Sequence, residues 1–185
     1  MVRPRPQLRH LGIHVRDLAA MEAFYTKLLG LVATDRGQGF TFKNDFIFLT
    51  GSPDQHHQLV LVSGRAPEGA SMVNQLSFKV GELDELREMH KRVRAAGVEG
   101  IRPVNHGNAF SIYFPDPEGN FVEIYMDTPW HIAQPHGDPL DFSLSNEALM
   151  ADTEARCRKD PTFQPRAERE AELARRIERQ LSAGD

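Results

Sequence analysis

The sequence predicts an α+β fold in which two βαβββ modules form a curved mixed sheet around a cleft, with a helical tail at the C-terminus. Residues 8–15 and 74–80 each alternate apolar and polar side chains, which is the period of a strand with one buried face. Each stretch is followed by a helical pattern and then by three more strand candidates. After Met126 the composition changes to proline and turn residues. The repeated order of elements indicates a duplicated unit, and the change in composition marks an extension.

The first module is predicted at about 8–64. Asp17 follows the first strand and provides an N-cap for a helix at 18–30, in which apolar residues recur at helical spacing and Gly30 gives the C-terminal stop. Gly, Asn, Asp and Pro residues separate the strand candidates that follow the helix. These strands are predicted at 31–37, 40–50 and 56–63.

The second module is predicted at about 73–127. Leu76, Phe78 and Val80 alternate with polar residues in its first strand, and a helix at 82–97 repeats the apolar stripe of the first helix. A single module would leave one face of its sheet uncovered, so we expect the two sheets to curve together, with helices outside and polar strand faces lining the cleft. The remaining strands are predicted at 98–104, 109–114 and 120–126.

The extension begins after the last predicted strand. Residues 127–143 are rich in proline and turn residues and are predicted to form an ordered loop over the domain, held by Trp130 and forming a wall of the cleft. From Asn146 onward the chain is polar and helical. The sequence therefore places a domain at 1–131 and a loop and helical extension at 132–185.

The last predicted helix carries a narrow apolar stripe of Leu173, Ile177 and Leu181, surrounded by charges of both signs. Such a stripe is too narrow to stabilise an isolated helix in water. We expect it to pack against the domain or against a partner subunit, which favours a homo-oligomer and in particular a dimer. A frayed helix in solvent is the alternative.

Composition and charge limit the classes of function. The 22 Lys and Arg residues are dispersed and are outnumbered by 26 Asp and Glu residues, so no nucleic acid partner is expected. No apolar run approaches the ~20 residues that span a bilayer, and the first residues lack the apolar core of a signal peptide. We therefore expect no membrane contact and a cytoplasmic location.

The chain contains a single cysteine, Cys157, which cannot form an internal disulfide and fits a reducing compartment. It also excludes a Cys-rich zinc site. Any metal would have to be held by histidine, glutamate and amide oxygens.

The repeated unit, the opening stretch "RHLGIHVRDLAAMEAFYTKLLGL" and the closing stretch "DPEGNFVEIY" resemble the vicinal oxygen chelate superfamily. This superfamily includes glyoxalases, bleomycin-binding proteins, fosfomycin-resistance transferases and type I extradiol dioxygenases. The resemblance covers residues 8 to about 131 and does not include the tail. It implies that the cleft holds a metal ion, with ligands at the start of the first strand of each module and in the last strand of the second. At these positions the sequence has His10, Gln75 and Glu123.

Glu123 also points to a cation by its own surroundings. It lies between Val122 and Ile124 in a predicted strand, so its side chain is on the face opposite to theirs. Burying an unpaired carboxylate is costly, and we therefore expect a cation partner. For His10 the alternative is a histidine at a strand end that packs or faces solvent, and His14, on the same face, is interpreted as a pocket wall.

The chain resembles small single-domain type I extradiol dioxygenases beyond these ligands. The segment "DQHHQLVL" resembles their segment with an acid/base histidine, which implies that role for His57. The segment "HGNAFSIYF" resembles their stretch with a histidine and a tyrosine near the substrate hydroxyls, which implies His106 and Tyr113. A tight turn at "DPEGN" is predicted to bring Tyr113 and Glu123 to one site. Paired surface histidines and a core tyrosine are the alternatives.

Gln75 departs from the extradiol pattern, because those enzymes normally have a second histidine there. A glutamine oxygen is a legitimate but weaker ligand that some glyoxalases use. Conversely, "HHQLVLVSG" has no carboxylate where glyoxalases usually place a ligand.

The resulting prediction is a metal-dependent extradiol dioxygenase that cleaves a catechol-like aromatic diol with O2. Fe(II) is the expected metal, with Mn(II) or another divalent ion as the alternative, because these ions take imidazole and carboxylate on one face and leave positions open. The alternatives are another metal-dependent enzyme of the superfamily, such as a glyoxalase-type isomerase or a transferase, and a non-catalytic protein that binds an aromatic or drug ligand.

Overall fold

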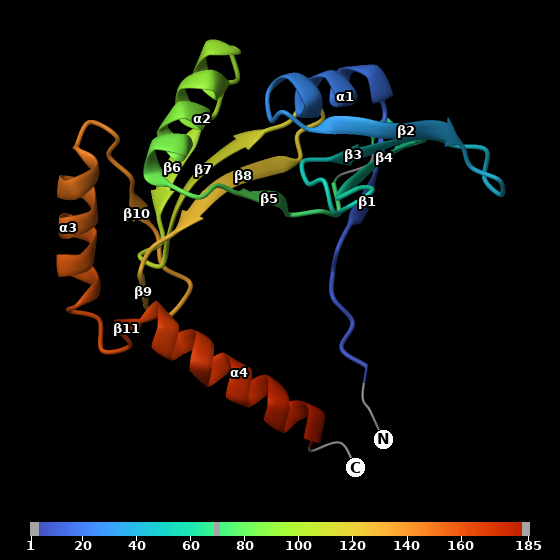
Figure 1. Ribbon diagram of the computed structural model, residues 1–185. Helices are drawn as coiled ribbons and strands as arrows, with labels where there is room; N and C mark the ends of the chain where they lie inside the picture. The colour runs from blue at the N-terminus through green and yellow to red at the C-terminus, as the bar shows by residue number, and fades with distance from the viewer. Residues whose placement is uncertain (1–3, 69–70, 183–185) are drawn as a thin grey trace.

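Two β-sheets form the framework of the protein, and each is built by one of the predicted modules (Figure 1). The computed structural model describes residues 4–68 and 71–182. The first sheet has the strand order β1-β4-β3-β2, and the second has β10-β6-β7-β8-β5. When the second order is read from its other end, β5-β8-β7-β6 repeats β1-β4-β3-β2, and β10 is an added strand. The predicted α+β class and the duplicated unit are confirmed.

The first sheet comes from β1 (Leu11–Val15), α1 (Leu18–Lys27), β2 (Val32–Gln38), β3 (Asp45–Thr50) and β4 (Leu59–Ser63). Strand β1 pairs parallel with β4, and the other neighbours are antiparallel. Asp17 caps α1 as predicted, because its Oδ1 accepts a hydrogen bond from the backbone N–H of Ala20. Three predicted strands of this module are shorter in the structure. Strand β1, predicted from residue 8, begins at Leu11 and leaves His10 just before it. Strand β3 begins at Asp45, because 39–44 form the hairpin turn, and β4 begins only after His56 and His57.

The second sheet comes from β5 (Gln75–Lys79), α2 (Leu83–Ala95), β6 (Arg102–Asn105), β7 (Ala109–Pro115) and β8 (Phe121–Asp127). Strand β5 pairs parallel with β8, which repeats the β1–β4 pairing of the first module. The stretch "DPEGN" forms the predicted tight turn, with a hydrogen bond from the backbone N–H of Gly119 to the carbonyl of Asp116. Strands β7 and β8 therefore lie antiparallel, with Tyr113 directly opposite Glu123.

One hydrophobic cluster contains buried residues of both modules. Helix α1 makes the connection, since its Phe24 ring lies 6.3 Å from the Phe114 ring, centroid to centroid, and its Tyr25 ring lies 6.3 Å from Phe78. Helix α2 contributes Leu86 and other buried residues from the second module to the same cluster. Burying these side chains in one core holds the two sheets in a fixed relation.

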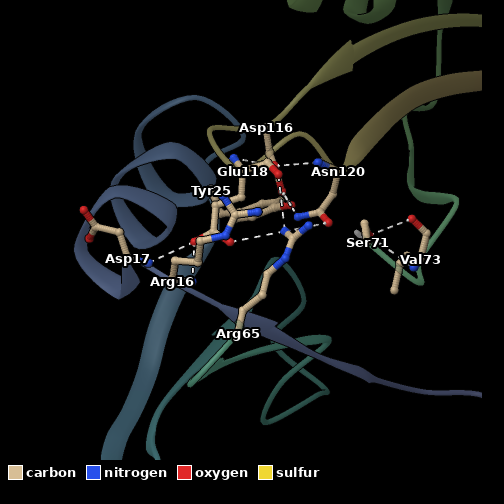
Figure 2. A network of polar contacts seen from close by, with 9 residues as sticks. All are labelled: Arg16, Asp17, Tyr25, Arg65, Ser71, Val73, Asp116, Glu118 and Asn120. Carbon is tan, nitrogen blue, oxygen red and sulfur yellow. Dashed lines mark hydrogen bonds and ion pairs between the residues drawn. The ribbon is translucent and has the colours of Figure 1, made fainter. Parts of the chain in front are cut away.

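A buried polar network also joins the modules, at the turn between β7 and β8 (Figure 2). The Tyr25 hydroxyl donates to Asp116, and burial together with the Asp116 carboxylate raises the pKa of that hydroxyl. Glu118 accepts from the backbone N–H of Asp17 and pairs with Arg65 at 3.2 Å, and both of these side chains are largely buried. Hydrogen bonds to buried charged groups are costly to break, so this network fixes the turn against the first module.

The extension docks on the second sheet through the segment after β8. Strands β9 (Trp130–His131) and β10 (Asp138–Pro139) lie in it, and β10 pairs with β6. Trp130 is buried and its indole N–H donates to the carbonyl of Gly107, so the predicted anchoring role of Trp130 is confirmed. Gly107 has φ 74°, and a Cβ built there would lie 2.4 Å from Ile132 Cδ1. Only glycine fits this contact.

The helices of the extension differ in how they pack. Helix α3 (Asn146–Cys157) buries Leu149 and Cys157. Strand β11 (Gln164–Pro165) leads to α4 (Arg166–Ser182), which buries no residue and extends away from the sheets (Figure 1). Leu173 and Ile177 are 38% and 54% exposed. None of the helices in the described ranges combines the length and the apolar character needed to cross a membrane.

Candidate active site

The polar face of the second sheet carries the strongest candidate site. Glu123 alternates with Val122 and Ile124, which are buried in the core, and its own side chain lies on the opposite face and is 7% exposed. Across the sheet, Glu123 is paired with Ser77 on β5 and with Tyr113 on β7. Three polar side chains therefore form one row on this face, as the alternation in β5, β7 and β8 requires.

The carboxylate of Glu123 accepts hydrogen bonds at both oxygens. Tyr113 donates to Oε1 at 2.5 Å, and Ser111 donates to the same atom at 2.8 Å. Ser77 donates to Oε2 at 2.5 Å and the Gln75 side-chain amide donates at 2.9 Å. A carboxylate has about four lone-pair sites, so protein donors satisfy this group. Burial of the Glu123 carboxylate therefore does not by itself require a cation partner, because protein hydrogen bonds take that place.

Ser77 and Ser111 were missed by sequence reasoning, although a signal for them exists. Each is the small polar residue between two apolar ones in its strand, so each lies on the face of Glu123. A buried carboxylate predicted in a strand should direct attention to hydroxyl groups at such positions on its neighbours.

Tyr113 connects Glu123 to His106. The Tyr113 hydroxyl lies 2.9 Å from His106 Nε2, and His106 Nδ1 lies 2.6 Å from the backbone carbonyl of His136. A carbonyl only accepts, so Nδ1 of His106 carries a proton. Burial and the Glu123 carboxylate raise the pKa of the Tyr113 hydroxyl. These contacts form one hydrogen-bonded path from Glu123 through Tyr113 and His106 to the loop at His136.

Two pockets, of about 580 and 400 Å³, adjoin this path, and His106 and Tyr113 line both. The larger is also lined by Gln75 and Arg102, and the smaller by Ser77 and Glu123. The extension contributes to both, from its segment 134–139. The prediction that this loop forms a wall of the cleft is therefore confirmed.

The predicted residues of the first module form a separate group. The rings of His10 and His57 lie 4.3 Å apart, centroid to centroid, and His57 also contacts Phe48. Desolvation lowers the pKa of the His57 imidazole, and the neighbouring His10 and His56 lower it further. His14 is exposed, with Nδ1 3.3 Å from the carbonyl of Ser63.

The structure therefore brings Gln75, His106, Tyr113 and Glu123 together and places His10 beside His57. Among residues 4–68 and 71–74, none lines either of the two pockets. Within the described ranges, no group of three or more His, Cys, Asp or Glu side chains is placed to hold a metal ion. The metal-binding role of His10 stays a prediction.

The residues from the first strand to Ile124 match a known family. A model of the Glyoxalase/Bleomycin resistance protein/Dioxygenase superfamily matches residues 7–124. The chain belongs to this superfamily. The topology of its two modules agrees with this membership.

Within the superfamily, the chain is similar to diol dioxygenases and to a lyase. It is 26% identical to biphenyl-2,3-diol 1,2-dioxygenase 2 of Rhodococcus globerulus over 80% of this chain and 84% of that protein. It is 28% identical to biphenyl-2,3-diol 1,2-dioxygenase 3 of the same organism, over 90% and 82%. A lactoylglutathione lyase of Salmonella typhimurium is 25% identical over 64% of this chain and 90% of that protein.

Solved structures of the superfamily share the fold. A glyoxylase/bleomycin resistance protein/dioxygenase domain from Frankia sp. is 22% identical, with a TM-score of 0.57, over 68% of this chain and 94% of that chain. The fosfomycin resistance protein FosX from Listeria monocytogenes, complexed with Mn(II), is 22% identical, with a TM-score of 0.54, over 68% and 95%.

The residues present fit a divalent metal by type, but His10 lies in a separate group and the contacts at Glu123 have to rearrange. Imidazole, amide oxygen and carboxylate are donors that Fe(II) and Mn(II) accept. In the structure Gln75 presents its amide nitrogen to Glu123, so a half-turn of the amide is needed to offer its oxygen instead. A metal at Glu123 also has to replace at least one of the four hydrogen bonds. Hydroxyl groups can rotate to allow this.

Proposed function

We propose that the protein is an extradiol dioxygenase that cleaves a catechol-like aromatic diol with O2, using Fe(II), with Mn(II) or another divalent ion as the alternative. The observation that carries this proposal is the extent of similarity. The two diol dioxygenases align over 80% and 90% of the chain, whereas the lyase aligns over 64%. The hydrogen-bonded row at Glu123 supports the same reaction class, because it provides a buried carboxylate beside titratable groups.

In the proposed site, His10, Gln75 and Glu123 hold the metal. The bound metal would supply a centre at which both diol oxygens and O2 are activated. Tyr113 and His106 form hydrogen bonds to a substrate hydroxyl and assist its deprotonation. His57 acts as the acid/base group that exchanges a proton with the substrate during ring opening. The segment 134–139 limits the access of water from one side.

We further propose that two copies complete each site. His10 and His57 lie on the first module and form a group separate from Gln75 and Glu123 on the second. A symmetric dimer in which the first module of one copy faces the second module of the other would join the two groups. This is the form of homo-oligomer that the proposed site requires.

Mixing two inactive variants tests this arrangement. His10→Ala and Glu123→Ala should each be inactive alone. After unfolding and refolding together in equal amounts, activity should recover to about a quarter of the wild-type value, because about half of the dimers are mixed and half of their sites are intact. No recovery, with mixed dimers demonstrated by a mass tag, would show that one chain builds the whole site.

Anaerobic reconstitution tests the reaction itself. The protein is loaded with Fe(II), bound metal is measured, and O2 uptake and a yellow ring-fission product are followed across a panel of catechols. Uptake of O2 with product formation, absent in the Glu123→Ala variant, is the expected result. Absence of both across a broad panel, with metal verified as bound, would contradict the proposal and favour another metal-dependent reaction of the superfamily.

A second candidate is a protein that binds an aromatic ligand without metal or turnover. It is favoured by one observation, that four protein donors satisfy the Glu123 carboxylate. Metal content separates the two candidates. Affinity for catechols that is unchanged by chelators would support the binding protein.

A further inference from the structure

A chain of hydrogen bonds ends at His57 and begins at a carboxylate on β2. Asp35 Oδ2 lies 2.7 Å from His56 Nε2, and His56 Nδ1 lies 2.8 Å from His57 Nδ1. His56 and His57 are neighbours in the loop before β4, and the Phe48 ring contacts both imidazoles. Neither Asp35 nor His56 has a role in the site described above.

An irregularity in β2 places Asp35 in this chain. Ala33 is paired with Leu49, but Asp35 is paired with Phe48, so Thr34 is an extra residue in the ladder. Residues two apart in a regular strand share a face, whereas Leu49 and Phe48 lie on opposite faces of β3. The bulge therefore moves Asp35 from the core face of Leu49 to the face of Phe48. Without the bulge Asp35 would point away from the histidines.

The chain allows one arrangement of protons when both imidazoles are neutral. An ionised carboxylate only accepts, so His56 Nε2 must carry the proton that is donated to Asp35. The other nitrogen of His56 then has no proton and can only accept. His57 must therefore donate from its Nδ1, which leaves Nε2 as the nitrogen without a proton. Its ring is also held from the sides by His10 and Phe48.

We propose that Asp35 and His56 are positioning residues for His57. They hold its imidazole in the Nδ1–H tautomer, so that Nε2 is the atom that exchanges a proton with a bound substrate. The hydrogen bonds can be tested on the protein alone, and the consequence for turnover rests on the proposed dioxygenase function. Because its proton is held at Nδ1, His57 begins the reaction with Nε2 free to accept a proton.

Nitrogen NMR of the metal-free protein tests the tautomer. The protein is labelled with 15N-histidine and studied at about pH 8, above the ordinary imidazole pKa of ~6.5. Wild type should show His57 protonated at Nδ1 and not at Nε2, and this signature should change to the Nε2–H tautomer or a mixture in Asp35→Ala and His56→Phe. Asp45→Asn is the matched control, since Asp45 lies in the same pair of strands and is exposed. An Nε2–H tautomer in wild type, or a signature unchanged in His56→Phe, would overturn the proposal.

Kinetics test the consequence. In Asp35→Ala, kcat should fall about 10-fold to 100-fold, with KM and Fe(II) affinity unchanged, because the substrate and metal contacts remain. Asp35→Asn keeps an oxygen acceptor for His56 Nε2–H, and most of the lost kcat should return in it. An unchanged kcat in Asp35→Ala would overturn the positioning role. If wild type cleaves no diol, the proposed function fails, while the tautomer signature still decides the hydrogen-bond chain.

Discussion

The two modules share a strand order but carry different chemistry at equivalent places. In the second module, Ser77 on β5, Glu123 on β8 and Tyr113 on β7 are paired in one row. In the first module the corresponding row is Gly12 on β1, Val60 on β4 and Phe48 on β3. The backbone arrangement is the same, but one row is polar and the other apolar.

This difference separates the scaffold from the site. The pairing of strands depends on backbone hydrogen bonds and on the buried face, and both modules keep these. The opposite face is free to vary. The second module has a carboxylate, Glu123, inside the row, whereas the carboxylate on this face of the first module is Asp35 on the edge strand β2. The first module contributes histidines from outside its row, at the strand start and in the loop before β4. The duplicated unit therefore provides the same strand arrangement twice, and the row of polar side chains is present only in the second module.

Removing the carboxylate should have the largest effect on this comparison. Glu123→Ala makes the polar row resemble the apolar one, and we expect metal binding and activity to be lost. The free energy of unfolding should fall by about 2 kcal/mol, because several buried donors lose their acceptor. Titration with Fe(II) or Co(II) and denaturant unfolding measure the two effects.

Val60→Ala is the matched control for this experiment. It alters the equivalent position of the first module and should also cost about 2 kcal/mol of stability through a lost buried side chain. Metal affinity should not change. If Glu123→Ala binds metal as well as wild type does, the metal centre is not at this row.

The second prediction concerns the histidine that the first module contributes. In His57→Ala, turnover should fall by about 10² to 10⁴ fold, because an acid/base group is lost, while metal and substrate still bind. Metal stoichiometry and anaerobic substrate affinity are measured beside turnover. Unchanged turnover, or loss of the metal, would remove His57 from the proposed role.

Gln75→His sharpens the comparison by making the second module closer to the usual extradiol pattern. Divalent transition metals prefer imidazole nitrogen to an amide oxygen, so affinity for Fe(II) should rise about tenfold, or ~1.4 kcal/mol, if Gln75 is a ligand. Titration of wild type and variant with Fe(II) measures this. An affinity that does not change would indicate that Gln75 only donates to Glu123, as its amide does in the structure.

The smallest effect is expected from the tail, which belongs to neither module. Deleting residues from Phe163 onward removes α4 and the ion pair between Arg166 and Asp127. The midpoint of thermal unfolding should fall by about 2–4 °C per kcal/mol lost, or the number of subunits found by sedimentation should change. A Leu173→Ser, Ile177→Ser double variant keeps Arg166 and removes only the apolar stripe. A truncated protein identical to wild type in both measurements would contradict an interaction role.

Sequence patterns predicted what depends on neighbours in the chain. The alternation around Glu123 gave its face correctly, and the "DPEGN" turn placed Tyr113 opposite Glu123, as found. The strand containing His56 and His57 was predicted too long, because apolar periodicity does not mark where pairing begins. The bulge at Thr34 changes which side chains share a face, and no local pattern shows such an insertion.

The relation between the modules was the part least accessible from sequence. The separation of His10 and His57 from the polar row depends on how α1 packs against Phe78 and Phe114 of the second module. Such packing is set by the shapes of side chains far apart in the chain. The four hydrogen bonds to Glu123 likewise come from three strands, and only the pairing register reveals them.

The close contact at Gly107 has a consequence for the order of folding. We expect the loop from Trp130 to Pro139 to dock after the β6–β7 hairpin has formed, because its anchor is the carbonyl of Gly107 inside that hairpin. During synthesis the chain emerges from its N-terminal side, so both modules can form before this loop is available. In a chain whose loop has not yet docked, the polar row at Glu123 would lack the wall that segment 134–139 provides. Substitution of Gly107 by alanine should prolong that open stage, since docking becomes sterically hindered while the sheet itself is already paired.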